Sequence, residues 1–192
     1  MKKNNTLKPA NYQKLLTPLP VIILFVTHSI FLLFIIFEEE NPWYIGLAHT
    51  VFILSVLLAY LYLFRRKDKI SNFSWSLSLG VLGGALLTGI LNIELGLGGV
   101  IASAVVGLVG VLIKKIFKNS SALLAPAIYC GSFIGMTKGF VEPYYLILSL
   151  AGIISGLFFS ISQFWFQGFG GKLGSIAFVG MLFSLLLHYF LW

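Results

Sequence analysis

Gly96-Leu97-Gly98-Gly99-Val100-Ile101-Ala102-Ser103 returns 72 positions later as Gly168-Phe169-Gly170-Gly171-Lys172-Leu173-Gly174-Ser175, and these two glycine-rich stretches organise the sequence. The alignment of residues 76–103 with residues 148–175 needs no gap and pairs six identical residues. A composition so rich in glycine and apolar residues gives roughly two or three identities by chance. We therefore interpret the match as an internal repeat. The identical pairs are Gly80 with Gly152, Gly84 with Gly156, Gly96 with Gly168, Gly98 with Gly170, Gly99 with Gly171, and Ser103 with Ser175.

The composition around these stretches is typical of a protein embedded in lipid. Hydrophobic residues make up 58% of the 192 residues and charged residues only 10%, whereas soluble domains carry about 25% charged residues to cover their surface. The charges occur in short clusters between long apolar runs, so we expect the apolar surface to face a membrane. The composition excludes a soluble fold and predicts an integral membrane protein with the lipid bilayer as a partner.

Seven apolar segments have about 17 to 25 residues, the length that an α-helix needs to cross a bilayer. We predict an all-α, polytopic integral membrane protein with seven transmembrane helices in a single domain, residues 1–192. Residues 1–18 form a cytoplasmic tail, 19–37 an extra first helix, 43–113 the first repeat and 121–191 the second. The predicted helices are 19–37, 43–64, 73–93, 97–113, 121–137, 143–166 and 173–191.

The lysine and arginine residues orient these helices, because cytoplasmic loops retain positive charge. With the N-terminus inside, twelve of the thirteen basic residues fall in inner segments and only Lys138 falls outside, while five of the six acidic residues lie outside. The net charge of +7 is thereby explained without a nucleic-acid partner, and the basic loops can contact anionic lipid. We expect the protein to lie in the bacterial cytoplasmic membrane, with its N-terminus in the cytoplasm and its C-terminus outside. This arrangement is compatible with a homo-oligomer.

Three helices in each repeat make the second copy run in the opposite direction, because an odd number of crossings ends on the other side of the membrane. Inverted repeats of this kind are typical of secondary transporters and of some channels. The organisation resembles that of the trimeric intracellular cation channels, which also combine two inverted three-helix units with one extra helix. In that family the extra helix comes last, whereas here it comes first, and the charged motif of the family has no counterpart in this sequence.

The two glycine turns are candidates for parts of a permeation path. Each turn precedes a helix whose N-terminal amides carry a partial positive charge, so a turn that dips into the membrane can hold an anionic group. The alternative is that the turns are merely short and that Lys172 reaches the interface as an inside-positive residue. The candidate residues are Gly98, Gly99 and Ser103 at the first turn, and Gly170, Gly171, Lys172 and Ser175 at the second.

Polar residues within the spans supply the other candidates, because an ionisable or polar group at membrane depth is costly unless it has a partner. His28 lies near the middle of the first helix; the alternative to a functional role is a neutral histidine bonded to a neighbouring helix carbonyl. Tyr129, Cys130 and Ser132 form a patch that suits a cavity wall and tight helix packing equally. Because Cys130 is the single cysteine and no His, Asp or Glu recurs at ligand spacing, we expect no metal and no cofactor.

These features favour a transporter or channel for a small solute or ion, with its path between the two repeats. No Asp or Glu lies mid-helix, which argues against proton-coupled transport. No catalytic constellation is apparent in the sequence.

One alternative is a membrane-embedded enzyme that acts on a phosphorylated or lipid substrate. The stretch Gly170-Gly171-Lys172-Leu173-Gly174-Ser175-Ile176-Ala177 is similar to the Gly-Gly-Lys-Gly-Val-Ala-Thr phosphate-binding turn of the bacterial seven-helix glycerol-phosphate acyltransferases. The other motifs of that family, a Ser-Gly-Asn-rich turn and a His-Arg-Glu segment, have no counterpart here. A further alternative is a substrate-binding subunit of a larger membrane complex.

Overall fold

The computed structural model describes residues 19–37, 43–65, 73–117, 121–139, 142–163 and 170–191, and every regular element in these ranges is an α-helix. The all-α prediction is confirmed, and the helices begin and end close to the predicted bounds. The helices that differ most from prediction are α6, predicted over 121–137, and α7, predicted over 143–166, of which residues 164–166 lie outside the described residues. The helices are α2 (Leu19–Phe37), α3 (Trp43–Arg65), α4 (Trp75–Ile93), α5 (Gly99–Ile116), α6 (Leu124–Gly135), α7 (Tyr144–Ile161) and α8 (Lys172–Leu191).

Four of the described helices, α4, α5, α7 and α8, are long and apolar enough to cross a membrane. Helix α6 has 12 residues and is therefore about 18 Å long, which is shorter than the roughly 30 Å hydrocarbon core of a bilayer. The chain is thus compatible with an integral membrane protein. Seven crossings and their inverted grouping stay predictions, and the predicted cytoplasmic tail, 1–18, lies outside the described residues.

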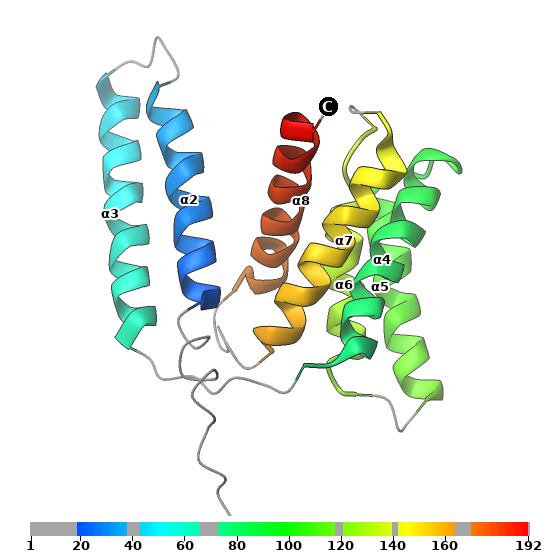
Figure 1. Cartoon of the computed structure of the whole chain (residues 1–192). Helices are drawn as coiled ribbons and strands as arrows, with labels where there is room; N and C mark the ends of the chain where they lie inside the picture. Colours follow the sequence, from blue (N-terminus) through cyan, green and yellow to red (C-terminus); the bar gives the residue numbers. More distant parts are fainter. Residues whose placement is uncertain are drawn as a thin grey trace, which may run out of the picture. The chain divides into compact units, whose positions relative to one another are not determined.

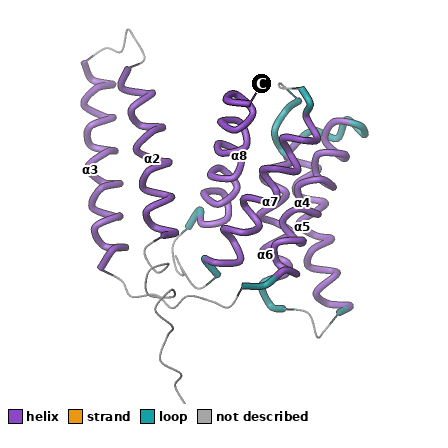
Figure 2. The backbone as a smooth tube through the Cα atoms, in the orientation of Figure 1, coloured by secondary structure: helices purple, strands orange, loops and turns teal. Residues whose placement is uncertain are grey.

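The chain divides into two compact units, residues 1–70 with α2 and α3, and residues 71–192 with the other five helices (Figures 1 and 2). The division falls inside the stretch 43–113 that we predicted to form the first repeat. In the first unit α2 packs along α3, and the ring of Phe25 meets the ring of Tyr60 edge-on with their centroids 5.2 Å apart.

Helix α4 is the centre of the second unit, because α5, α6 and α7 all pack against it. Glycines let α6 lie directly on its backbone: a Cβ added at Gly131 would overlap the carbonyl oxygen of Val81, and one at Gly84 would overlap the carbonyl oxygen of Ile128. In lipid, helices associate mainly through packing and interhelical hydrogen bonds, so such close approach is the expected source of stability.

Helices α4 and α7 run antiparallel and are joined by serine side chains. The hydroxyl of Ser78 donates to the carbonyl oxygen of Gly156 at 2.9 Å, and the backbone amide of Ser74 donates to the hydroxyl of Ser160 at 2.7 Å. A Cβ at Gly156 would lie 2.7 Å from the carbonyl oxygen of Ser78, so this pair of helices is also closely packed.

Helix α8 completes the bundle by packing on α7 and α6. The hydroxyl of Ser184 donates to the carbonyl oxygen of Ile147 at 2.8 Å, and the hydroxyl of Ser155 donates to the carbonyl oxygen of Ile176 at 3.1 Å. These bonds satisfy polar groups that would otherwise be costly to bury in an apolar interior.

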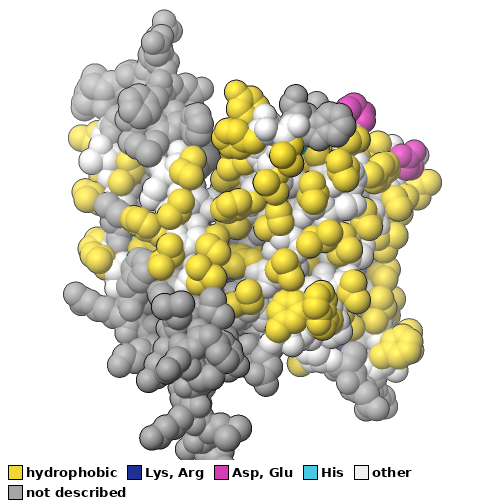
Figure 3. All heavy atoms as spheres, viewed as in Figure 1, with side chains coloured by type: hydrophobic (Ala, Val, Ile, Leu, Met, Phe, Trp, Pro, Cys, Tyr) yellow, Lys and Arg dark blue, Asp and Glu magenta, His cyan; other side chains and the backbone are white. Residues whose placement is uncertain are grey.

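The outer surface of the second unit is apolar over most of the face in Figure 3. Large side chains such as Val100, Leu108 and Ile116 are 67% to 73% exposed. Contiguous exposed apolar surface of this kind has to be covered by lipid or by another protein.

The described charges of the second unit separate between its two ends. Glu94 follows α4 and accepts a hydrogen bond from the Tyr145 hydroxyl at 2.7 Å, at the end where α7 begins. Lys114 and Lys115 lie in the last turn of α5, at the opposite end, and Lys172 lies there too because it contacts the last residues of α7. We define these as the acidic end and the basic end; Glu142 and Lys138 also lie at the acidic end.

Candidate functional site

Helix α6 brings three consecutive residues into contact with three different helices. Successive residues of an α-helix turn by about 100°, so Cys130, Gly131 and Ser132 face in three directions. Gly131 lies against α4, Ser132 contacts α5 and Cys130 contacts α8. This part of the patch, which suits a cavity wall and tight helix packing equally in sequence, is therefore the junction at which α6 is held by its neighbours.

The contact between α6 and α5 is a pair of buried hydroxyls. The oxygens of Ser103 and Ser132 lie 2.8 Å apart, and the Ser132 hydroxyl is also 2.8 Å from the carbonyl oxygen of Tyr129, to which it donates. Because one hydroxyl has a single proton to donate, Ser103 must be the donor to Ser132. The structure thus brings together two sequence candidates that lie 29 positions apart, and it joins them as a closed interhelical bond.

Tyr129 does not share this interior position. Its side chain is 40% exposed and its ring lies over Gly107 of α5, where an added Cβ would be 3.0 Å from the ring. The ring also packs against Phe133, with centroids 4.7 Å apart. Tyr129 therefore covers the seam between α5 and α6 on the outer surface.

The start of α8 makes two polar contacts, one with Cys130 of α6 and one from Lys172 to the end of α7. The Cys130 thiol is fully buried and lies 3.4 Å from the carbonyl oxygen of Leu173. The Lys172 ammonium donates to the carbonyl oxygens of Ser162 and Gln163, each at 2.8 Å. A lysine placed in this way satisfies carbonyls left open at the C-terminal end of a helix and complements its negative partial charge. The described role of Lys172 is thus to bind the end of α7.

The first glycine turn lies at the acidic end of the bundle. Gly96 and Gly98 have positive φ angles of 63° and 78°, which glycine adopts without steric cost. A Cβ at Gly99 would lie 2.8 Å from the carbonyl oxygen of Met136, so α5 begins in contact with the end of α6. Ser103 is four residues, about 6 Å, further along α5.

The second glycine turn lies at the basic end, so the two turns occupy opposite ends of the bundle (Figure 1). Gly171 has a φ of 79°, and a Cβ at Gly170 or Gly171 would meet no atom within 4 Å. Ser175 continues α8, its amide bonded to the carbonyl of Gly171 at 2.9 Å; Gly168 and Phe169 lie outside the described residues. This placement gives no support to the hypothesis that both turns approach the middle of the membrane.

His28 belongs to the first compact unit and is held within it. Its Nδ1 atom lies 2.9 Å from the carbonyl oxygen of Leu24 and 2.7 Å from the hydroxyl of Tyr60. One ring nitrogen either carries a proton or accepts one, so donation to Leu24 and acceptance from Tyr60 exclude each other. The Leu24 carbonyl belongs to the same helix as His28 and not to a neighbouring helix, so the contact between helices is the one with the Tyr60 hydroxyl of α3.

A polar cluster whose members were not predicted to lie together is found where α4, α6 and α7 meet. The Asn92 side-chain amide donates to the carbonyl oxygens of Gly135 and Thr137, at 3.1 and 3.2 Å, and the Tyr144 hydroxyl donates to the carbonyl of Thr137 at 3.1 Å. Thr88, one turn before Asn92, is fully buried, and its hydroxyl has no hydrogen-bond partner among the described residues. The spacing of four residues on one face of α4 is the signal that could have revealed this cluster.

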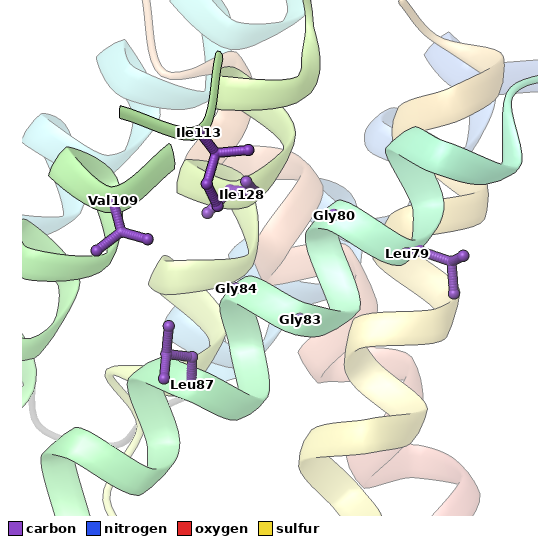
Figure 4. A pocket seen from close by; sticks show the side chains of 8 residues that line it. All are labelled: Leu79, Gly80, Gly83, Gly84, Leu87, Val109, Ile113 and Ile128. Carbon is purple, nitrogen blue, oxygen red and sulfur yellow. The ribbon is translucent and has the colours of Figure 1, made fainter. Parts of the chain in front are cut away.

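An apolar groove runs along α4, between α4 and α5 (Figure 4). Its volume is about 280 Å³. The figure shows the bare backbone of three glycines on one side and the side chains of Val109 and Ile113 on the other, with Ile128 of α6 beneath. The lining residues are Leu79, Gly80, Gly83, Gly84, Leu87, Val109, Ile113 and Ile128.

Within the described ranges, no group of three or more His, Cys, Asp or Glu side chains could hold a metal ion. Comparison of the chain with protein-family models, with curated proteins and with solved structures finds no match.

Proposed function

We propose that the chain is a membrane transporter or channel for a small solute or ion, with a path between two inverted three-helix repeats, 43–113 and 121–191. The observation that supports this proposal best is the register of α4 and α7. Ser74 lies level with Ser160, and Ser78 lies level with Gly156. In this antiparallel register Val81 comes level with Ile153, and these two residues are equivalent in the sequence repeat. If a twofold axis in the membrane plane relates α4 to α7, one pair of equivalent residues must lie at the same level along the two helices, inside both of them.

The separation of charges supports the proposed orientation. The basic end of the second unit carries Lys114, Lys115 and Lys172, and the carboxylates of Glu94 and Glu142 lie at the acidic end. Positive charge is retained on the cytoplasmic side, so we place the basic end and the N-terminus inside the cell and the C-terminus outside. We further propose that this membrane is the cytoplasmic membrane of a bacterium.

The interior contacts of α6 are closed, so a path between the two repeats requires α6 to separate from a helix of the first repeat. Ser132 is bonded to Ser103 of α5, in the first repeat, and the buried Cys130 thiol lies against α8, in the same repeat as α6. The contacts of α6 with α4 place backbone against backbone, because a Cβ added at Gly131 would overlap the carbonyl oxygen of Val81. We therefore propose that α5 separates from α6 during transport, while α4 and α6 stay together.

A disulfide between α5 and α6 tests this mechanism. The hydroxyl oxygens of Ser103 and Ser132 are 2.8 Å apart. The two side chains therefore already point toward each other, as the side chains of two cysteines have to do before their sulfur atoms can form a bond of about 2.05 Å. We would prepare the Ser103→Cys/Ser132→Cys protein with Cys130→Ala, reconstitute it in liposomes, and measure the flux of anions, cations and neutral solutes. The matched control carries Ser103→Cys and Cys130→Ala alone, which cannot cross-link.

We expect flux of at least one solute class in the reduced protein, its loss on oxidation and its return on reduction, with no effect of oxidant on the control. Flux that is no greater than in empty liposomes for every class would refute the proposed function. Flux that persists in fully cross-linked protein would refute the separation of α5 from α6 as the step that opens the path.

No observation favours the enzyme alternative. The Lys172 ammonium, which would have to bind a phosphate, donates to two backbone carbonyls. The Cys130 thiol is fully buried against a backbone carbonyl, and a buried thiol of this kind is inert as a nucleophile.

A further inference from the structure

The apolar groove beside α4 has a length that suits one leaflet of a bilayer. Its lining residues on α4 extend from Leu79 to Leu87, eight residues or about 12 Å along the helix axis. Half of a roughly 30 Å hydrocarbon core is about 15 Å. Three of the lining residues, Gly80, Gly83 and Gly84, have no side chain, and an added Cβ at Gly83 would meet no atom within 4 Å. The groove is therefore open at Gly83, whereas Gly80 and Gly84 face α6, and its walls are apolar side chains and glycine backbone.

The groove begins near the basic end and continues toward the middle of the unit. Leu79 lies one turn after the start of α4, and Ile113 lies one turn before the end of α5. One turn further out, the exposed Ser76 lies on the same face of α4 as Leu79 and Gly80. Its neighbour Trp75 is 70% exposed, and an exposed tryptophan at a helix end is typical of the membrane–water interface.

The same end carries exposed positive charge. Lys114 and Lys115 directly follow Ile113 and are both exposed in the last turn of α5. The carboxylates that the structure describes in this unit, Glu94 and Glu142, lie at the acidic end. Lysines near the surface of a membrane attract anionic lipid, and their long side chains can reach a headgroup while the aliphatic stem stays on apolar surface.

We propose that this groove binds an anionic glycerophospholipid, with one acyl chain along Gly80, Gly83 and Gly84 and its phosphate against Lys114 and Lys115. The apolar walls match the acyl chain, the depth matches one leaflet, and the charge lies where the headgroup of that leaflet lies. A second copy of the chain in the same membrane orientation fits less well, because it brings its own lysines to the same level and like charges repel.

Two substitutions separate the acyl-chain contact from the headgroup contact. Gly83→Leu places a side chain in the groove at a position where an added Cβ meets nothing within 4 Å, and Gly174→Leu, at a second such position, is the matched control outside the groove. Lys114→Gln with Lys115→Gln removes the headgroup charge. The full chain would be purified in detergent, its helicity and thermal unfolding checked, and the retention of phosphatidylglycerol and phosphatidylcholine measured by native mass spectrometry.

We expect wild type and Gly174→Leu to retain phosphatidylglycerol over phosphatidylcholine. Neutralising the lysines should reduce that preference by about 5-fold for each charge, and Gly83→Leu should reduce the retention of both lipids. Equal retention of the two lipids by wild type, or unchanged retention in Gly83→Leu, would overturn the proposal. Conversion of a dimer to a monomer by Gly83→Leu with lipid retention unchanged would also overturn it, by identifying the groove as an interface between copies.

Discussion

Replacing Gly131 with alanine should push α6 away from α4 and lower the free energy of unfolding. The added Cβ would overlap the carbonyl oxygen of Val81 and lie 2.8 Å from the amide nitrogen of Ala85. Favourable contact between carbon and its neighbours needs about 3.5 Å, so α6 would have to retreat by at least about 0.7 Å. Both obstructing atoms belong to the backbone of α4 and cannot rotate away. Overpacking of a core typically costs about 1 to 3 kcal/mol, and we expect the upper part of this range.

The measurement is the free energy of unfolding in detergent micelles, followed by the loss of helical circular dichroism during denaturant titration. The matched control is Gly174→Ala in α8, where the added Cβ meets nothing within 4 Å. Because alanine is a better helix former than glycine by about 1 kcal/mol, this control should be as stable as the wild type or more so. A Gly131→Ala protein that matches the wild type, or a control that is equally destabilised, would refute the backbone-to-backbone contact between α4 and α6.

Three further substitutions test individual polar groups. Thr88→Val replaces the buried hydroxyl without a partner by a methyl group of similar shape, and we expect unchanged stability or a gain of about 1 kcal/mol in the same titration; a clear loss would mean that the hydroxyl binds a group of its own. Lys172→Met removes two hydrogen bonds to the end of α7 and should cost about 1 to 3 kcal/mol, whereas Lys172→Arg should retain most of the stability; equal loss in both would exclude the capping role. Tyr60→Phe removes the hydroxyl 2.7 Å from Nδ1 of His28 and should change the imidazole nitrogen chemical shifts while costing about 0.6 kcal/mol; unchanged shifts would show that the two side chains are not bonded.

The positions of the helices follow from the sequence because each apolar run satisfies its own backbone. In lipid a helix forms all its hydrogen bonds within one segment, so an uninterrupted apolar stretch determines an element almost alone. The predicted segment 43–64 became Trp43–Arg65, and 173–191 became Lys172–Leu191. The segment 121–137 was harder, because α6 is only 12 residues long and its first predicted residues lie in a turn. The location of the charges at the two ends was predictable as well, because the charged residues lie in the short segments between the apolar runs.

What the sequence by itself determined is therefore the all-helical chain, its breaks at glycine turns and the membrane character of its surface. Only the tertiary structure decided which helix each polar residue meets: Cys130 turns to α8, Ser132 to α5, and Lys172 to the end of α7. It also decided that the groove lies between α4 and α5. The physical reason is that hydrogen bonds inside a helix join residues four apart, whereas contacts between helices depend on the shapes of surfaces from distant parts of the chain, and a serine or glycine looks the same in sequence on any face.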